Sequence, residues 1–261
     1  MELVVVIALL VLLGLCILPV LAQTQPDTRA FQCLNNQRQL ARAWRMYADD
    51  NNDRLVGVIF DSSILVNDPR TPWIQGWLDW TTRTDNTNKI FLTDPRYAAL
   101  ANYYGRDSTL FKCPTDRSLS TIQRSIGWKE RVRSVSANLY VGGEEVETGP
   151  FDPSLTVVDK LTELTNPKPA ETWLFMDEHP DSINDGSLFA PQIGRWIDIP
   201  SNLHDGSAGV AYADGRAEMH RWQGTALNIP IGFSFFAPSA PPNDPDILWL
   251  RSHTPRKPGV N

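Results

Sequence analysis

Residues 1–22 read MELVVVIALLVLLGLCILPVLA, an almost uninterrupted apolar run on which the interpretation of the whole chain depends. About 20 apolar residues can cross a bilayer as a helix, so we predict a membrane span here. Glu2 and Pro19 interrupt the pattern. A cleavable signal peptide would begin with Lys or Arg, whereas this run begins with an acid. A plain membrane anchor stays open as an alternative, although a carboxylate in hydrocarbon costs roughly 2.5–3.5 kcal/mol and usually has a partner.

The run ELVVVIALLVLLGLCILPVLA resembles the N-terminal helix of type IV pilins and type II secretion pseudopilins. In that family a short basic leader is cleaved, a Glu follows shortly after the cleavage point, and a Pro kinks the apolar helix further along. Glu2 and Pro19 match these positions. The resemblance implies that Glu2 meets the free amino terminus of a neighbouring subunit in a filament, after a prepilin peptidase has removed the leader. Because the leader and the cleavage site are missing here, we expect the natural chain to begin upstream of Met1.

A second helical pattern runs from residue 28 to residue 48, TRAFQCLNNQRQLARAWRMYA. Its residues Cys33, Leu40, Trp44 and Tyr47 recur at three- and four-residue steps, which predicts one apolar face. The Pro-Asp pair just before this segment predicts a kink or a restart of the helix. The resemblance implies that residues 23–48 are the amphipathic half of a pilin helix, packed on a sheet.

Later stretches predict strands. The segment 133–143 ends in a Gly-Gly turn, and TWLFMD at 172–177 is apolar enough for a buried strand. GVAYADGRAEMHRW alternates around Asp214 and Gly215, which predicts a hairpin because Asp-Gly favours a tight turn. We therefore predict an α+β fold, in which a long N-terminal helix packs on an antiparallel sheet within a loop-rich head.

His204 and the pair Asp214-Gly215 form an H-x9-DG pattern. Together with LFKCPTD, RSVSANLYVGG and DEHPDSINDG, this pattern is similar to a pilin-like family that has the same type of N-terminal helix. In this order the motifs extend over most of the chain. The resemblance marks His204, Asp214 and Gly215 as family-motif positions, and turn geometry explains them better than catalysis does.

Composition limits the class of protein. The chain has 261 residues and a net charge of −6 without a basic block, which argues against nucleic-acid binding. Roughly 240 residues beyond the predicted span are enough for one domain with a core. Nine Trp and 20 Pro indicate short elements and many loops. We divide the chain into the span at 1–22, the amphipathic helix at 23–48, the head at 49–237 and a Pro-rich tail at 238–261.

The chain has three cysteines, of which Cys16 lies in the predicted span. If the head is extracytoplasmic, Cys33 and Cys113 are expected to form a disulfide. Metal binding by these cysteines is not expected from the sequence, because neither has a Cys-x-x-Cys or His neighbour at ligand spacing.

The stretch after the predicted strand at 172–177 is acidic, and calcium prefers oxygen ligands of this kind. Its spacing matches no EF-hand, so a hydrogen-bonded acidic turn is the main alternative, and a transition-metal site with His179 and His204 is a third. The candidate calcium ligands are Asp177, Glu178, Asp181, Asn184 and Asp185.

A hydrolase would need His204 as a base with Asp214 or Asp177, and Ser207 as the nucleophile. The chain has no Gly-x-Ser-x-Gly elbow, which argues against this chemistry. We expect His220 to be exposed on the hairpin. Loops rich in Trp, at Trp73, Trp77 and Trp80, could bind sugars or pack internally.

These observations predict a structural subunit, a pseudopilin or minor pilin, of a type II secretion or type IV pilus-like filament, without catalysis. The expected partners are copies of itself, other pilin-like subunits, the assembly platform and the prepilin peptidase. The expected location is the inner membrane, with a periplasmic or extracellular head. The alternatives are a membrane-anchored module that binds polysaccharide and an anchored metallohydrolase.

Overall fold

The computed structural model describes residues 28–59, 71–143, 152–257 and 259. The predicted span at 1–22, with Glu2 and Pro19, and the predicted kink at 26–27 lie outside the described residues. Within the described ranges, no helix is both long and apolar enough to cross a membrane.

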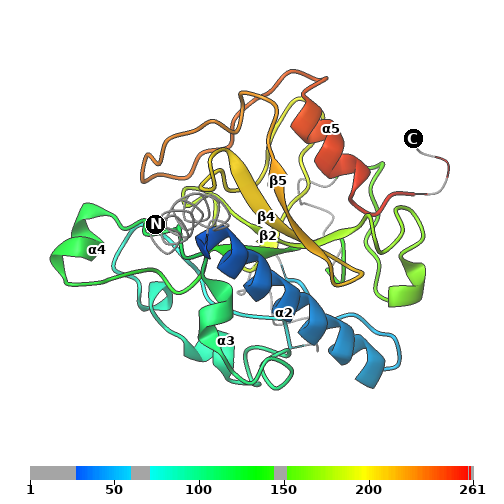
Figure 1. Ribbon diagram of the computed structural model, residues 1–261, viewed down its shortest axis with the longest axis horizontal. Helices are drawn as coiled ribbons and strands as arrows, with labels where there is room; N and C mark the ends of the chain where they lie inside the picture. Colours follow the sequence, from blue (N-terminus) through cyan, green and yellow to red (C-terminus); the bar gives the residue numbers. More distant parts are fainter. Residues whose placement is uncertain (1–27, 60–70, 144–151, 258, 260–261) are drawn as a thin grey trace, which may run out of the picture.

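The predicted amphipathic helix is confirmed as α2, which spans Thr28–Asp50. Its buried face carries Leu40 and Trp44 together with small residues such as Ala41 and Ala48. Small side chains let a helix approach a sheet closely, and α2 contacts β4, β5 and β2 (Figure 1). The opposite face of the helix is exposed to solvent.

The strands form one five-stranded sheet in the order β3-β1-β2-β4-β5. Their bounds are β1 Val135–Asn138, β2 Trp173–Asp177, β3 Ser187–Leu188, β4 Ser207–Tyr212 and β5 Ala217–Arg221. The neighbouring pairs β1–β2, β2–β4 and β4–β5 are antiparallel, whereas β3 runs parallel to β1. The expectation of a purely antiparallel sheet is therefore wrong. Strands β1 and β2 run in opposite directions, and the chain reverses direction again between β2 and β3. Strand β3, which pairs with β1 on the side away from β2, is therefore parallel to β1.

The predicted Asp-Gly hairpin is confirmed between β4 and β5. Ser207 pairs with Arg221 and Ala211 pairs with Ala217 across it. Gly215 has a φ of 90°, a conformation that side-chain-bearing residues rarely adopt, which explains the glycine at this turn.

The two faces of the sheet have separate cores. On the side of α2, Leu40 and Trp44 pack with Phe175 and Ala211. On the other side, Val210 and Tyr212 pack with residues of α5, which spans Pro245–Ser252. Residues alternate between the two cores along β4, as expected for a strand buried on both faces. In Figure 1 the strands β4 and β5 lie between α2 and α5.

The stretch 238–261, expected as a tail, therefore contains a helix that belongs to the core. Ile247 and Leu250 of α5 are both 0% exposed. The remaining helical pieces are short, and most lie between α2 and β1: η2 Thr84–Asn86, α3 Ile90–Thr93, η3 Ser108–Phe111, α4 Thr121–Ser125 and η4 Leu161–Glu163.

Candidate functional site

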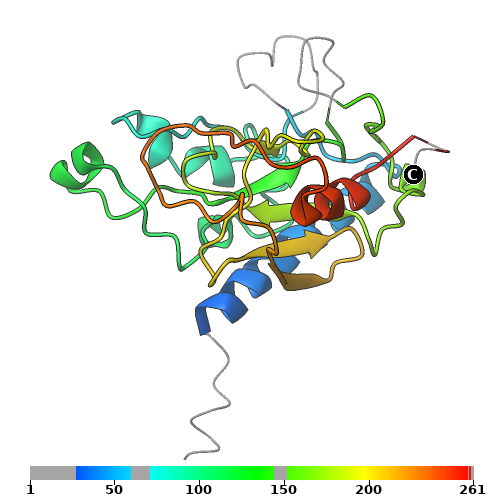
Figure 2. The same cartoon turned by 90° about the horizontal axis from the view of Figure 1, so that it is seen from above.

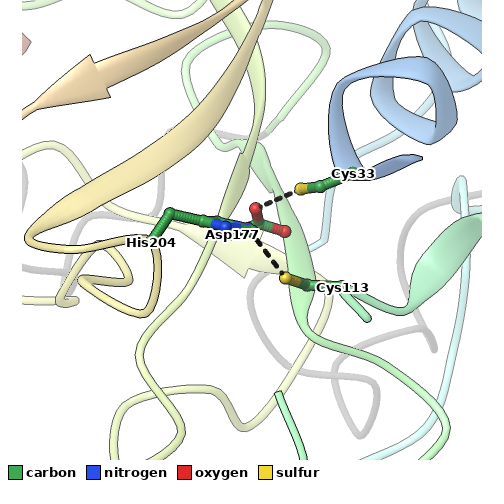
Figure 3. Close-up of side chains that lie close together, drawn as sticks. All are labelled: Cys33, Cys113, Asp177 and His204. Atoms are coloured by element: carbon green, nitrogen blue, oxygen red, sulfur yellow. Dashed lines mark hydrogen bonds between the residues drawn. The ribbon is translucent and has the colours of Figure 1, made fainter. Parts of the chain in front are cut away.

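Two thiols, one carboxylate and one imidazole meet beneath α2. Cys33, Cys113, Asp177 and His204, here called the thiol cluster, are all buried, and their potential ligand atoms lie within 4.8 Å of one another. Figure 3 shows these side chains converging from separate parts of the chain. Cys33 and Asp177 are 144 positions apart in sequence, so the cluster is a product of the tertiary fold.

A different element positions each member of the thiol cluster. Cys33 lies on the buried face of α2, and Asp177 is the last residue of β2. Cys113 follows η3 after one intervening residue. His204 begins the turn into β4, where its N–H donates to the carbonyl of Ser207 over 3.2 Å and its carbonyl accepts from the N–H of Ser207 over 3.0 Å.

Direct contacts link the cluster in pairs. The Cys33 thiol donates to Asp177 Oδ2 with an S···O distance of 2.7 Å. Cys113 Sγ lies 3.2 Å from His204 Nε2. The other ring nitrogen of His204, Nδ1, lies 3.4 Å from the hydroxyl oxygen of Thr115. The imidazole is therefore held by a partner at each nitrogen.

Strand β4 contributes a glycine where it faces the cluster. A Cβ on Gly209 would lie 2.9 Å from Asp177 Oδ2, 3.0 Å from Cys33 Sγ and 2.7 Å from Gln37 Nε2. The Gly209 N–H donates to Asp177 Oδ2 over 3.3 Å, and its carbonyl accepts from Gln37 Nε2 over 3.0 Å. The missing side chain lets α2 and the cluster approach the sheet.

The electrostatics of the cluster follow from its burial. Burial raises the pKa of the Asp177 carboxyl to about 8, and the neighbouring Cys113 adds to this effect. The closeness of the two thiols raises the pKa of Cys33 and lowers the pKa of Cys113. His204 lowers the pKa of Cys113 further. The fold therefore holds a proton more tightly at Cys33 and Asp177 than at Cys113.

The expected disulfide is not formed in this structure. Cys33 and Cys113 are both free thiols, although the fold brings them into one cluster. Pairing the two head cysteines located their common neighbourhood, but the two sulfurs are not bonded to each other in this structure. Each sulfur instead faces an oxygen or nitrogen ligand, Asp177 for Cys33 and His204 for Cys113.

The predicted calcium ligands do not converge. Glu178 accepts from Ser182 Oγ over 2.7 Å, and Asp181 Oδ2 accepts from the N–H of Gly232 over 2.6 Å. These carboxylates therefore face different partners. Within the described residues, the predicted ligands form no group of three or more ligating side chains apart from the one Asp177 belongs to.

The end of the acidic stretch has the geometry of a hydrogen-bonded turn. Asp185 accepts from the N–H of Ser187 over 2.8 Å and from its hydroxyl over 2.6 Å, while Asn184 Oδ1 accepts from the N–H of Asp185 over 2.7 Å. Asp177 is the member of the set that reaches the thiol cluster.

The residues of the hydrolase alternative are only partly brought together. Asp214 is exposed at the hairpin tip, where it accepts from the N–H of Arg216 over 2.9 Å, so it is not the partner of His204. Asp177 does lie in the cluster with His204, but both are buried beside thiols. His179 is held elsewhere, with Nε2 3.2 Å from the carbonyl of Ile229, and is not part of the cluster.

His220 is not exposed as expected. It is half-buried, and its ring stacks on Trp249 of α5 with centroids 3.7 Å apart. Its polar neighbours in sequence suggested a surface position, but the packing of α5 against the hairpin covers it.

A cavity of about 290 Å³ lies away from the cluster and is lined by Trp77, Trp80, Arg131 and Asp181 among others; we call it the Trp cavity. Arg131 is fully buried and its guanidinium lies 3.9 Å from the Trp80 ring centroid. Among the described residues, Arg131 Nε and Nη1 and Asp181 Oδ1 have no hydrogen-bond partner. Trp73 lies in the core instead, where it donates to the carbonyl of Gly186 over 2.9 Å.

Sequence reasoning named every member of the thiol cluster but never as one group. It considered Cys33 with Cys113 as a disulfide and Asp177 as a calcium ligand. It placed His204 in a turn motif, with Asp177 or Asp214 in a hydrolase pair, and with His179 in a transition-metal site. Spacing along the chain contained no signal of their convergence, because each comes from a different segment.

Comparisons with known proteins identify no relative: no family model, no curated protein and no solved structure matches this chain.

Proposed function

We propose that this protein is a structural subunit, a pseudopilin or minor pilin, of a type II secretion or type IV pilus-like filament. The observation that carries the proposal is the packing of α2, which begins a few residues after the apolar run 1–22 and lies along the sheet. A helix that is apolar first and amphipathic afterwards can be anchored in a membrane or filament core and still hold its own head.

The orientation of α2 supports this role. Figure 2 shows the start of α2, in dark blue, at the outer edge of the molecule. Thr28, the first residue of the helix, is exposed to solvent. The face of α2 that turns away from the sheet exposes Phe31 to 58% and Met46 to 51%. In a filament, this face is available to neighbouring subunits. The proposed partners are copies of this chain, other pilin-like subunits and the inner-membrane assembly platform.

The test is Glu2→Leu in the full-length gene with its leader restored. We expect the variant to insert and fold normally but to enter sheared filaments poorly, because a buried carboxylate at this position needs the cationic amino terminus of a neighbour. Incorporation is measured by immunoblot of the filament fraction. Glu171→Leu, which removes an exposed carboxylate from the head, is the matched control and should leave incorporation unchanged.

In a plain anchor, Glu2→Leu would be neutral or improve membrane retention. Normal filament yield from this variant would therefore contradict the proposal and favour a membrane-anchored surface module.

The Trp cavity favours a second candidate function, the binding of a saccharide. Sugars stack on aromatic rings and offer hydroxyl groups to buried polar atoms, and the unpartnered atoms of Arg131 and Asp181 suit this chemistry. Titration with neutral and acidic oligosaccharides should quench Trp fluorescence, and Trp77→Ala should abolish the effect. Trp128→Ala, half-buried and outside the cavity, is the control. A flat titration with every oligosaccharide would remove this candidate.

A further inference from the structure

The geometry points to a structural zinc site formed by Cys33, Cys113, Asp177 and His204, which clips α2 to the sheet. This inference goes beyond the proposed role as a subunit and does not depend on it, since a filament subunit needs no metal. It contradicts the expectation from sequence spacing that the cysteines bind no metal.

The donor set is the first observation. Zinc in structural sites is four-coordinate and takes thiolate sulfur, imidazole nitrogen and carboxylate oxygen. The thiol cluster offers two sulfurs, one imidazole nitrogen and one carboxylate, with all ligand atoms within 4.8 Å of one another. Calcium and magnesium are excluded by this chemistry, because those ions prefer oxygen ligands throughout.

The spacing of the donors is the second observation. Bonds of about 2.0–2.3 Å in a tetrahedron place neighbouring ligand atoms about 3.3–3.8 Å apart. In the structure, Cys113 Sγ lies 3.2 Å from His204 Nε2, Cys33 Sγ lies 2.7 Å from Asp177 Oδ2, and the widest pair is within 4.8 Å. Shifts of about 1 Å or less per ligand atom would therefore place one central ion at bonding distance from all of them.

The surroundings of the ligands are the third observation. Metal-bound histidines usually donate the other ring N–H to a nearby oxygen, and His204 Nδ1 lies 3.4 Å from Thr115 Oγ1. That arrangement leaves Nε2, the nitrogen beside Cys113, available for the metal. Gly209 donates its N–H to the Asp177 carboxylate and has no side chain to obstruct the site.

Burial indicates a structural rather than a catalytic site. The exposed fractions are 1% for Cys33, 3% for Cys113, 2% for Asp177 and 8% for His204. A catalytic zinc keeps an open position for water or substrate, whereas this site would be closed by protein ligands. Its effect would be mechanical: it would join α2, the segment after η3, the end of β2 and the turn before β4.

Metal content is the primary test. The full chain is expressed with zinc, purified in detergent without a metal-affinity step, and analysed by elemental mass spectrometry. We expect about one zinc per chain. Cys113→Ser and His204→Gln should each lower zinc content at least about tenfold. Cys16→Ser and His220→Gln, which change the same residue types outside the cluster, should retain it.

A second measurement guards against variants that fail to fold. Wild-type protein exchanged into cobalt should show the absorption bands of tetrahedral thiolate coordination, and X-ray absorption should report two sulfur and two lighter ligands. Removal of the metal with a chelator should increase hydrogen exchange in the first half of α2, around Cys33, and zinc should restore protection.

Two results would overturn the inference. One is wild-type protein that, after reduction and incubation with zinc, contains no bound metal. The other is a Cys33–Cys113 disulfide in the unreduced protein that is accompanied by failure of the reduced protein to take up zinc or cobalt.

Discussion

At the scale of single residues, Asp116 illustrates how a buried charge is kept ionised. Its carboxylate lies 2.6 Å from Lys112 Nζ, and the side chains are 1% and 10% exposed. Burial alone would raise the pKa of Asp116, but the positive charges of Lys112 and Arg131, with hydrogen bonds that include one from the N–H of Ser118, lower it below its usual value. The folded state therefore favours the ionised form of this group.

The contribution of Asp116 to the free energy of unfolding depends on pH. Because the pKa of Asp116 is lower in the folded than in the unfolded state, its stabilising effect is present above the unfolded value of about 4 and is lost as the pH falls through the folded value. Asp116→Asn should lower the free energy of unfolding at pH 7 by about 1–3 kcal/mol and should flatten its decline below about pH 4.

Urea unfolding of the wild type and Asp116→Asn from pH 3 to pH 7 measures both effects. Asp205→Asn is the control, because Asp205 is exposed and its positive φ of 51° is tolerated by Asn. Parallel pH profiles for the wild type and Asp116→Asn would show that the ion pair does not stabilise the fold.

At the scale of elements, one arginine fastens α5 to a distant part of the chain. Arg251 Nη1 donates to Asp152 Oδ2 over 2.6 Å and to the carbonyl of Pro191 over 3.1 Å. Its Nη2 donates to Ser154 Oγ over 3.0 Å. Arg251 and Asp152 are each 13% exposed, so solvent weakens this pair less than a surface ion pair.

Arg251→Met should therefore lower the free energy of unfolding by about 1–3 kcal/mol, because Asp152 loses a charged donor in a largely buried place. Denaturant titration followed by circular dichroism measures the change. Arg221→Met, on the exposed end of β5, is the matched control and should stay within about 0.5 kcal/mol of the wild type. Equal effects of the two substitutions would contradict the assigned role of Arg251.

At the scale of the whole molecule, the C-terminal segment completes the second core. Ile247 and Leu250 pack against the face of the sheet that carries Val210 and Tyr212. The indole N–H of Trp173 donates to Thr254 Oγ1 over 3.0 Å, which ties the start of β2 to the end of this segment. The segment that contains α5 is therefore part of the core of the head.

A chain that ends at Ala237 should fail to fold cooperatively. It would lose the burial of Ile247 and Leu250, worth about 1.5–3 kcal/mol each, and would uncover one face of the sheet. Together these losses are a large part of a typical total stability of about 5–15 kcal/mol. A chain that ends at Lys257 should melt like the wild type. Calorimetry distinguishes them, and a sharp transition in the Ala237-terminated chain would show that α5 is dispensable.

Local patterns were sufficient to predict α2 and the Asp-Gly hairpin, and both are confirmed. Helical periodicity and turn chemistry act between residues only a few positions apart, so the amino-acid order contains them directly. The apolar run 1–22 also led to a membrane and filament role, which stays a proposal.

The parallel strand β3, the docking of α5 and the thiol cluster could not be read from the amino-acid order. Cys33, Cys113, Asp177 and His204 lie on separate segments, and neither cysteine has a second cysteine or a histidine at ligand spacing. Their meeting depends on how α2 crosses the sheet and on Gly209, which leaves room between them. Such distances are set by the packing of whole elements against a shared core, a long-range property to which every buried residue contributes and which no short stretch encodes.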